Sequence, residues 1–242
     1  MWVAAWWGLV GGIALLVGAG LALLWRVPSR LTGLIMAFGS GVLISALAFE
    51  LAAEAFHRAG PVPMVGGLAA GALSFFVGDW IIDRRGGEHR KRSGGQQSGG
   101  QAGAIVLGSL LDGVPESVAI GVSLLDGSGV SAAVVAAVFL SNVPESMSAA
   151  TGLRKAGHSK RWIVGLWAGV ALLSAVSAGA GYQLLGGAPL EVVAVTQAFA
   201  AGAILTMLAD TMMPEAFEDG GNVVGLVTCL GFTLAFLLSQ LG

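Results

Sequence analysis

The amino-acid sequence predicts an all-α protein, a polytopic membrane bundle of eight transmembrane helices in a single membrane domain. Two observations lead to this prediction. Of the 242 residues, 55% are hydrophobic and only 11% are charged, whereas about 25% of the residues in a soluble domain are charged. The apolar residues also gather into long runs, each close to the roughly 20 residues that a helix needs to cross a bilayer.

The predicted spans follow one another with short connections, except after the third. The first run lacks the basic residues that precede the apolar core of a signal peptide, so we interpret it as a retained span. The long connection at 84–101 is basic and rich in Gly, Ser and Gln, which is typical of a flexible linker. A tight turn near 126–129 makes the fourth and fifth spans antiparallel. The spans are expected at 3–25, 31–55, 62–83, 103–125, 129–151, 162–185, 192–215 and 221–241.

The basic residues predict the orientation in the membrane. Of the 12 Lys and Arg residues, 11 lie in the odd-numbered connections, and only Arg58 lies in an even-numbered one. Because cytoplasmic loops carry the excess of basic residues, we expect the linker 84–101 to be cytoplasmic and both termini to lie outside. The expected location is the plasma membrane, which is the inner membrane of a bacterial cell.

An internal repeat links the second and seventh spans. Residues 37–56 align without gaps with residues 198–217 and are identical at eight of twenty positions. The two spans are expected to cross in opposite directions, and inverted repeats are typical of secondary transporters. Chance similarity between two Ala- and Leu-rich stretches is the alternative, but the shared ending Glu-Ala-Phe favours a true repeat.

Two related motifs place a proline beside a glutamate within apolar sequence, at 110–119 (LLDGVPESVA) and 139–148 (FLSNVPESMS). Carboxylates inside a membrane are costly unless they are paired, protonated or bound to a cation. No Lys or Arg lies in the interior of any predicted span, so protonation and cation binding remain as explanations.

The spacing of these residues suggests one site. Asp112 and Glu116 are one helical turn apart, so they share a face. Pro115 and Pro144 each remove one helical hydrogen bond, which we expect to open the helix locally. Because both motifs fall in mid-span, the sequence predicts a cation site near the bilayer centre. The alternative is that the prolines only kink the helices and the glutamates are neutral acids. The expected site is formed by Asp112, Glu116, Asn142 and Glu145.

Other polar residues carry weaker signals. Near the span ends, carboxylates could line a pathway for the cation or simply reach water; these are Glu50, Glu54, Asp210 and Glu215. The three histidines are peripheral, and a solvated position is expected for each. The single cysteine, Cys229, excludes a disulfide framework and a cysteine-based metal site within one subunit.

With these motifs and this topology, the sequence resembles the ZIP (Zrt/Irt-like) family of divalent metal transporters. That family has eight spans, outward termini and a variable cytoplasmic loop after the third span. Its signature is a His-Asn-x-Pro-Glu-Gly element in the fourth span, with a similar element in the fifth. The resemblance assigns metal-binding roles to Glu116, Asn142 and Glu145. Here Asp112 and Ser141 stand where the family has histidines, and Ser174 stands where a further glutamate often lies.

The expected function is transport of divalent cations into the cytoplasm by alternating access. The resemblance favours Zn²⁺ or Fe²⁺, whereas an all-oxygen site suits harder ions such as Mn²⁺. A single bound cation is expected, as a substrate rather than a cofactor, and no organic cofactor is expected. The Gly-rich helix faces permit a homodimer in the lipid bilayer.

Other functions were weighed against this one. An intramembrane metalloenzyme would need a metal held by His or Cys, and no HExxH motif or in-span histidine exists, so no enzyme activity is expected. No nucleotide-binding loop is present, which argues against an ATP-driven pump, and no nucleic-acid partner is expected. A proton-linked carrier of a non-metal substrate, or a regulatory relative that does not transport, remains the alternative.

Overall fold

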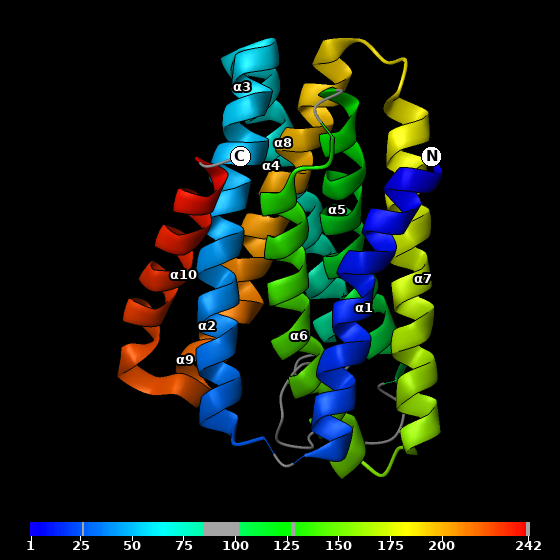
Figure 1. Ribbon diagram of the computed structural model, residues 1–242, viewed down its shortest axis with the longest axis vertical. Coiled ribbons are helices and arrows are strands. Elements are labelled where there is room, and N and C mark those ends of the chain that lie inside the picture. Colours follow the sequence, from blue (N-terminus) through cyan, green and yellow to red (C-terminus); the bar gives the residue numbers. More distant parts are fainter. Residues whose placement is uncertain (26, 85–101, 127–128, 241–242) are drawn as a thin grey trace.

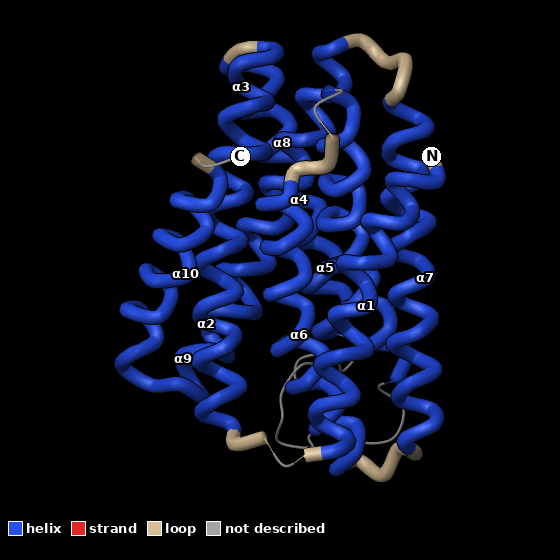
Figure 2. Tube along the Cα trace, viewed as in Figure 1, coloured by secondary structure: helices blue, strands red, loops and turns tan. Residues whose placement is uncertain are grey.

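The computed structural model describes all residues except 26, 85–101, 127–128 and 241–242, and of residues 102–106 and 126 it describes the backbone alone. Within these limits the chain consists of helices and short connections, without a β-strand (Figures 1 and 2). The helices in chain order are α1 (Trp2–Leu24), α2 (Ser29–Ala46), the π-helical η1 (Leu47–Ala52), α3 (Ala53–Ala59), α4 (Pro61–Ile82), α5 (Ala102–Ser123), the 3₁₀ turn η3 (Leu124–Asp126), α6 (Ala132–Lys155), α7 (Lys160–Leu185), α8 (Leu190–Met207), the π-helical η4 (Leu208–Met212), α9 (Met213–Gly220), the 3₁₀ turn η5 (Gly221–Val223) and α10 (Val224–Ser239).

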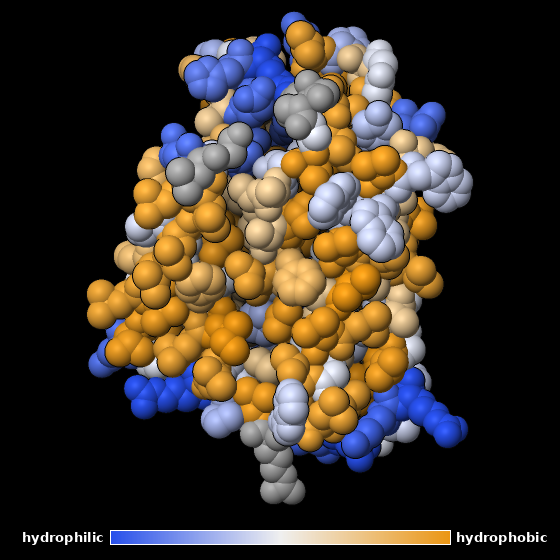
Figure 3. Space-filling model, in the orientation of Figure 1, coloured by the Kyte–Doolittle hydropathy of each residue, from blue (hydrophilic) through white to orange (hydrophobic). Residues whose placement is uncertain are grey.

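The long helices form a membrane-type bundle. Among the described residues, six segments are long and apolar enough to cross a bilayer. These six treat Leu190–Ser239 as one segment and do not include α5, so the count of eight spans stays a prediction. The face of the molecule in Figure 3 is apolar along its middle and hydrophilic at both ends, as expected for a protein that sits in a bilayer.

Basic side chains gather at one end of the bundle. The connections from α1 to α2 and from α6 to α7 lie together at this end, opposite α3 (Figure 1). Arg30 lies in the first turn of α2, at this end, and Arg154 and Lys160 flank the α6–α7 connection. All three side chains are exposed. Arg58 lies on α3, at the other end. The predicted linker lies, apart from Arg84, outside the described residues.

Two helices are longer than expected, and each contains a π-helical segment. The second predicted span, 31–55, is part of a helix that continues through η1 and α3 to Ala59, so Arg58 lies in its last turn rather than in a connection. The seventh predicted span, 192–215, continues through η4 and α9 to Gly220. Each extended helix is followed by a glycine with positive φ, Gly60 (80°) or Gly221 (72°), a conformation that favours glycine.

These features occur at equivalent positions of the sequence repeat. In the alignment of 37–56 with 198–217, Leu47 corresponds to Leu208, where the two π-helical segments begin. Gly60 corresponds to Gly221 in the same register. Figure 1 shows α2–α3 and α8–α9 running in opposite directions. The two segments therefore share a change of helix type and a terminal glycine in the same register, which argues against chance similarity.

Helix α2 crosses α10 at two glycines. A Cβ atom added to Gly41 on α2 would collide with the backbone carbonyl of Thr228, and one added to Gly231 on α10 would collide with that of Phe38. Only glycine therefore permits this close approach of two helix backbones.

Helix α8 crosses α4 in the same way. A Cβ atom on Gly202 would collide with the carbonyl of Leu68, and one on Gly71 would collide with that of Phe199. Gly202 and Phe199 are the repeat equivalents of Gly41 and Phe38. The two halves of the bundle thus share a helix crossing, as well as a sequence pattern.

We expect Gly41→Ala to destabilise the protein by about 1–3 kcal/mol, because the added methyl group meets backbone that cannot rotate away. In a helix with free space around it, the same change is neutral or stabilising by roughly 0.5–1 kcal/mol. Gly66→Ala is the matched control, since no atom lies within 4 Å of a Cβ added there. Thermal unfolding in detergent measures both; equal stability of the two variants would contradict the tight crossing.

Helices α5 and α6 carry the two Pro-Glu motifs. Helix α6 packs against α1 and α2, while α5 packs against α7 and α8. They lie in the interior of the bundle in Figure 1. The carboxyl groups of both motifs are enclosed by the other helices, although Val114 of the first motif is exposed.

Candidate cation site between α5 and α6

The two motifs meet through Ser141 of α6 and Glu116 of α5. The Ser141 hydroxyl lies 3.4 Å from Oε1 of Glu116 and 3.0 Å from the carbonyl oxygen of Val138, the two acceptors for its single proton. This contact joins residues from two helices that the antiparallel turn predicted to be neighbours. Ser141, one of the two predicted replacements for a family histidine, therefore touches a predicted ligand.

All five predicted site residues are buried. The exposed fraction is 2% for Asp112, 0% for Glu116, 0% for Ser141, 4% for Asn142 and 3% for Glu145. Three carboxyl groups are thus removed from bulk water on two adjacent helices. Burial of this kind strongly disfavours uncompensated negative charge.

Asn142 is oriented by helix α1. Its Nδ2 atom donates a hydrogen bond to the carbonyl oxygen of Gly11 at 3.1 Å. This bond involves the amide nitrogen and not the amide oxygen. A hard metal ion would bind to the oxygen.

The helices continue through both prolines, although each proline still removes one helical hydrogen bond. Helix α5 extends on both sides of Pro115, and α6 on both sides of Pro144. In each motif the serine after the glutamate donates to a backbone carbonyl four residues earlier: Ser117 to Gly113 at 2.6 Å and Ser146 to Asn142 at 2.7 Å. These serines add backbone contacts just beyond the proline in each helix.

The carbonyl of Leu140, which Pro144 deprives of its helical donor, lies at the interface with α2. A Cβ atom added to Gly39 of α2 would lie 2.9 Å from this oxygen. The freed carbonyl is therefore covered by protein, which is the condition under which such a group is tolerated at membrane depth.

The carboxyl groups themselves do not form a close ligand cluster. In the part of the chain that the structure describes, no three His, Cys, Asp or Glu side chains lie close enough together to hold a metal ion. The structure thus brings Glu116 and Ser141 into contact, but does not bring Asp112, Glu116 and Glu145 to one point.

Two of the predicted pathway residues contact α6 near its two ends. Glu50 of η1 accepts a hydrogen bond from the Ser131 hydroxyl at 2.9 Å, and Ser131 also caps the first turn of α6. Glu215 of α9 accepts a hydrogen bond from Ser148. Carboxylates from the two repeat-related helices therefore form hydrogen bonds at the start of α6 and in its second half. The sequence did not predict these contacts.

The other two pathway residues differ from each other. Glu54 forms an ion pair with Arg58 one turn later, with Nε 2.8 Å from Oε1. Asp210 lies in η4 and is exposed. For these two residues, contact with water or a local partner accounts for their position.

Ser174 of α7 lies close to the first motif. Its hydroxyl oxygen is 3.9 Å from a Cβ atom added at Gly113, and it donates to the carbonyl of Val170 at 3.2 Å. Helix α7 therefore does approach the first motif at this residue.

The histidines that the structure describes are peripheral, as predicted. His57 is exposed, and His158 stacks on Trp162 with ring centroids 4.5 Å apart. His89 lies outside the described residues.

No protein-family model matches this sequence, and no curated protein matches it.

Proposed function

We propose that the protein is a secondary transporter that moves divalent metal cations into the cytoplasm by alternating access. The proposed site lies between α5 and α6 and consists of Asp112, Glu116, Ser141, Asn142 and Glu145. The observation that carries this proposal is the contact between Glu116 and Ser141, because it joins the two Pro-Glu motifs inside the bundle.

Charge supports a cation as the substrate. Helix α5 contains no Lys or Arg, and the basic residues of α6 are confined to its last turn, at Arg154 and Lys155. Buried carboxyl groups in such helices mark cation or proton pathways in membrane proteins. A divalent ion that lost its water shell would be held by carboxylate, amide and hydroxyl oxygens.

The repeat supports alternating access. Two extended helices, α2–η1–α3 and α8–η4–α9, run in opposite directions and contact α6 through Glu50 and Glu215. Inverted repeats of this kind permit a transporter to adopt two related arrangements about one site. In the proposed eight-span topology, the end of the bundle that carries Arg30 and Arg154 faces the cytoplasm.

The resemblance to the ZIP family supports metal ions over other cations, with Zn²⁺ favoured on that ground. The oxygen-only ligand set suits Mn²⁺ and Fe²⁺ as well. We therefore propose these three ions as the substrates to be compared.

Uptake of Zn²⁺, Mn²⁺ and Fe²⁺ into proteoliposomes tests the proposal directly. We expect saturable uptake of at least one of the ions, with competition between them. Flux of all three ions that does not exceed the flux into protein-free liposomes would reject the proposed function.

Metal uptake should weaken as the pH falls from neutral. A carboxylate must lose its proton before it binds a metal ion, so metal binding releases protons. Two measurements check this: uptake at a series of external pH values, and proton release into weakly buffered solution when metal is added to the purified protein. Metal binding without proton release would show that the carboxyl groups are already ionised.

A further inference from the structure

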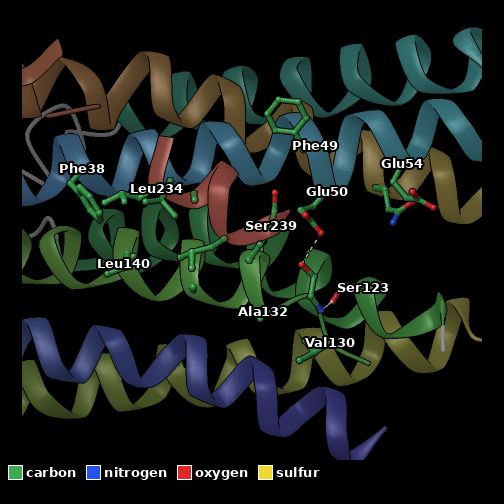
Figure 4. A pocket seen from close by; sticks show the side chains of 17 residues that line it. Phe38, Phe49, Glu50, Glu54, Ser123, Val130, Ala132, Leu140, Leu234 and Ser239 are labelled. Atoms are coloured by element: carbon green, nitrogen blue, oxygen red, sulfur yellow. Dashed lines mark hydrogen bonds between the residues drawn. The ribbon is translucent and has the colours of Figure 1, made fainter. Parts of the chain in front are cut away.

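A second feature of the bundle is a cavity of about 670 Å³ (Figure 4). It lies between three helices: the continuous helix α2–η1, α6 and α10. Its size falls within the roughly 300–1,000 Å³ of small-molecule sites and far exceeds the space that one metal ion needs. Most of its wall is apolar, formed by side chains such as Phe38, Val42, Val130, Leu140, Leu234 and Leu238.

The polar residues on this wall include two carboxylates, Glu50 and Glu54, and Glu54 is paired with Arg58. The others are Ser123, Ser131, Gln197 and Ser239. Glu50 reaches the cavity from η1, where one of its oxygens accepts the Ser131 hydroxyl at 2.9 Å. An ionised carboxylate has about four acceptor positions, so this bond leaves it able to accept more. In Figure 4 the Glu50 carboxylate points towards the start of α6, near the labelled Val130 and Ala132, and a dashed line marks its hydrogen bond.

Gln197 provides a second, independent acceptor. It lies on α8, which packs against η1, and it lines the same cavity with only 2% of its surface exposed. Its Oε1 atom is buried and has no hydrogen-bond partner among the described residues. A buried amide oxygen without a partner costs about 1–3 kcal/mol. Rotation of the Gln197 side chain towards a donor in the cavity would remove this cost.

We propose that this cavity binds an organic ammonium ion with an apolar body. An ammonium group has three donors and no acceptor, which complements Glu50 and Gln197. No Lys, Arg or His is among the described residues that line the cavity, and the apolar walls would cover the hydrocarbon part of the ligand.

This site is separate from the proposed metal site and does not depend on the proposed function. A ligand in the cavity touches η1, α6 and α10 at once. It therefore opposes any movement of these helices against one another, and its binding is expected to slow whatever conformational change the bundle performs.

Binding of radiolabelled 4-phenylbutylamine to the protein in lipid nanodiscs tests the proposal. Its neutral analogue, 4-phenylbutan-1-ol, has almost the same shape but no positive charge. We expect saturable binding of one amine per protein, and only non-saturable partition of the alcohol into lipid. This comparison needs no variant, so it stands even where a substitution disturbs folding.

Two variants then locate the site. Glu50→Gln keeps an acceptor for Ser131 but removes the charge, and should weaken amine binding by about tenfold or more. Gln197→Leu should weaken it by about fivefold. Glu191→Gln and Gln183→Leu are the matched controls, because both residues are exposed and lie away from the cavity lining, and they should bind as the parent does.

Equal, saturable affinity for the amine and the alcohol would overturn the proposal, as would unchanged amine affinity in Glu50→Gln. Binding of Zn²⁺ or Mn²⁺ alone that is lost in Glu50→Gln, with no saturable amine binding, would assign the cavity to metal ions and would also overturn it.

Discussion

We expect Glu116→Gln and Glu145→Gln each to abolish metal uptake, reducing it by about 100-fold or more. Loss of an outer-shell partner of a metal ligand already costs roughly 10- to 100-fold in affinity or activity, so loss of a ligand charge should cost at least as much. Both residues are almost completely buried, at 0% and 3% exposed, so water cannot replace the missing charge. Uptake of Zn²⁺ and Mn²⁺ into proteoliposomes measures the effect.

The same variants should fold as well as the parent. Glutamine has the shape of glutamate, and at position 116 its side-chain oxygen can still accept the Ser141 hydroxyl. Replacing a buried carboxylate by a neutral amide removes the cost of desolvating a charge. The midpoint of thermal unfolding in detergent should therefore stay unchanged or rise, which separates loss of function from loss of structure.

Glu191→Gln is the control for a general effect of removing negative charge. Glu191 is exposed in the first turn of α8, far along the chain from either motif, and the variant should transport like the parent. If both Glu116→Gln and Glu145→Gln also transport like the parent, the cation site lies elsewhere.

Much of the architecture could be predicted because it depends on properties that are local in sequence. Apolar runs and positively charged connections placed the helices, and most predicted limits fall within a few residues of the observed ones. The largest differences are at Ala59, Lys155 and Gly220, where helices continue past the predicted ends. Polar residues in these last turns, such as Arg58 and Glu218, obscured the continuation because they lower the local hydropathy.

The π-helical segments could not be predicted from either span alone. A π turn contains one extra residue relative to an α turn, and no residue type marks that insertion. The repeat did contain the information, since the alignment already paired Leu47 with Leu208. The alignment did not indicate, however, that the helix changes from α to π at these paired residues.

The contacts of the candidate site were predicted only in part. The meeting of Glu116 with the second motif followed from two mid-span motifs on antiparallel helices. The hydrogen bond between Glu50 and Ser131 joins residues 81 positions apart, and the burial of Gln197 depends on the packing of α8 against η1. Such contacts are set by tertiary packing, which one sequence without relatives does not reveal.

The identity of residue 112 should decide which ion the site prefers. If the proposed resemblance to the ZIP family holds, Asp112 takes the place of a histidine; its side chain is buried, at 2% exposed. Imidazole nitrogen favours Zn²⁺, whereas carboxylate oxygen suits harder ions such as Mn²⁺. We therefore expect Asp112→His to shift the ratio of Zn²⁺ to Mn²⁺ uptake towards zinc by about tenfold, a change of roughly 1.4 kcal/mol in relative affinity.

Competition measures this ratio most cleanly, with both ions present and the uptake of each followed by elemental analysis of washed proteoliposomes. Asp112→Asn is the matched variant, because it also removes the charge but supplies an amide oxygen instead of a nitrogen ligand. It should reduce the uptake of both ions without favouring zinc. A zinc preference that is the same in the parent, Asp112→His and Asp112→Asn would mean that residue 112 does not contact the transported ion, and the ligand set would then rest on Glu116, Asn142 and Glu145.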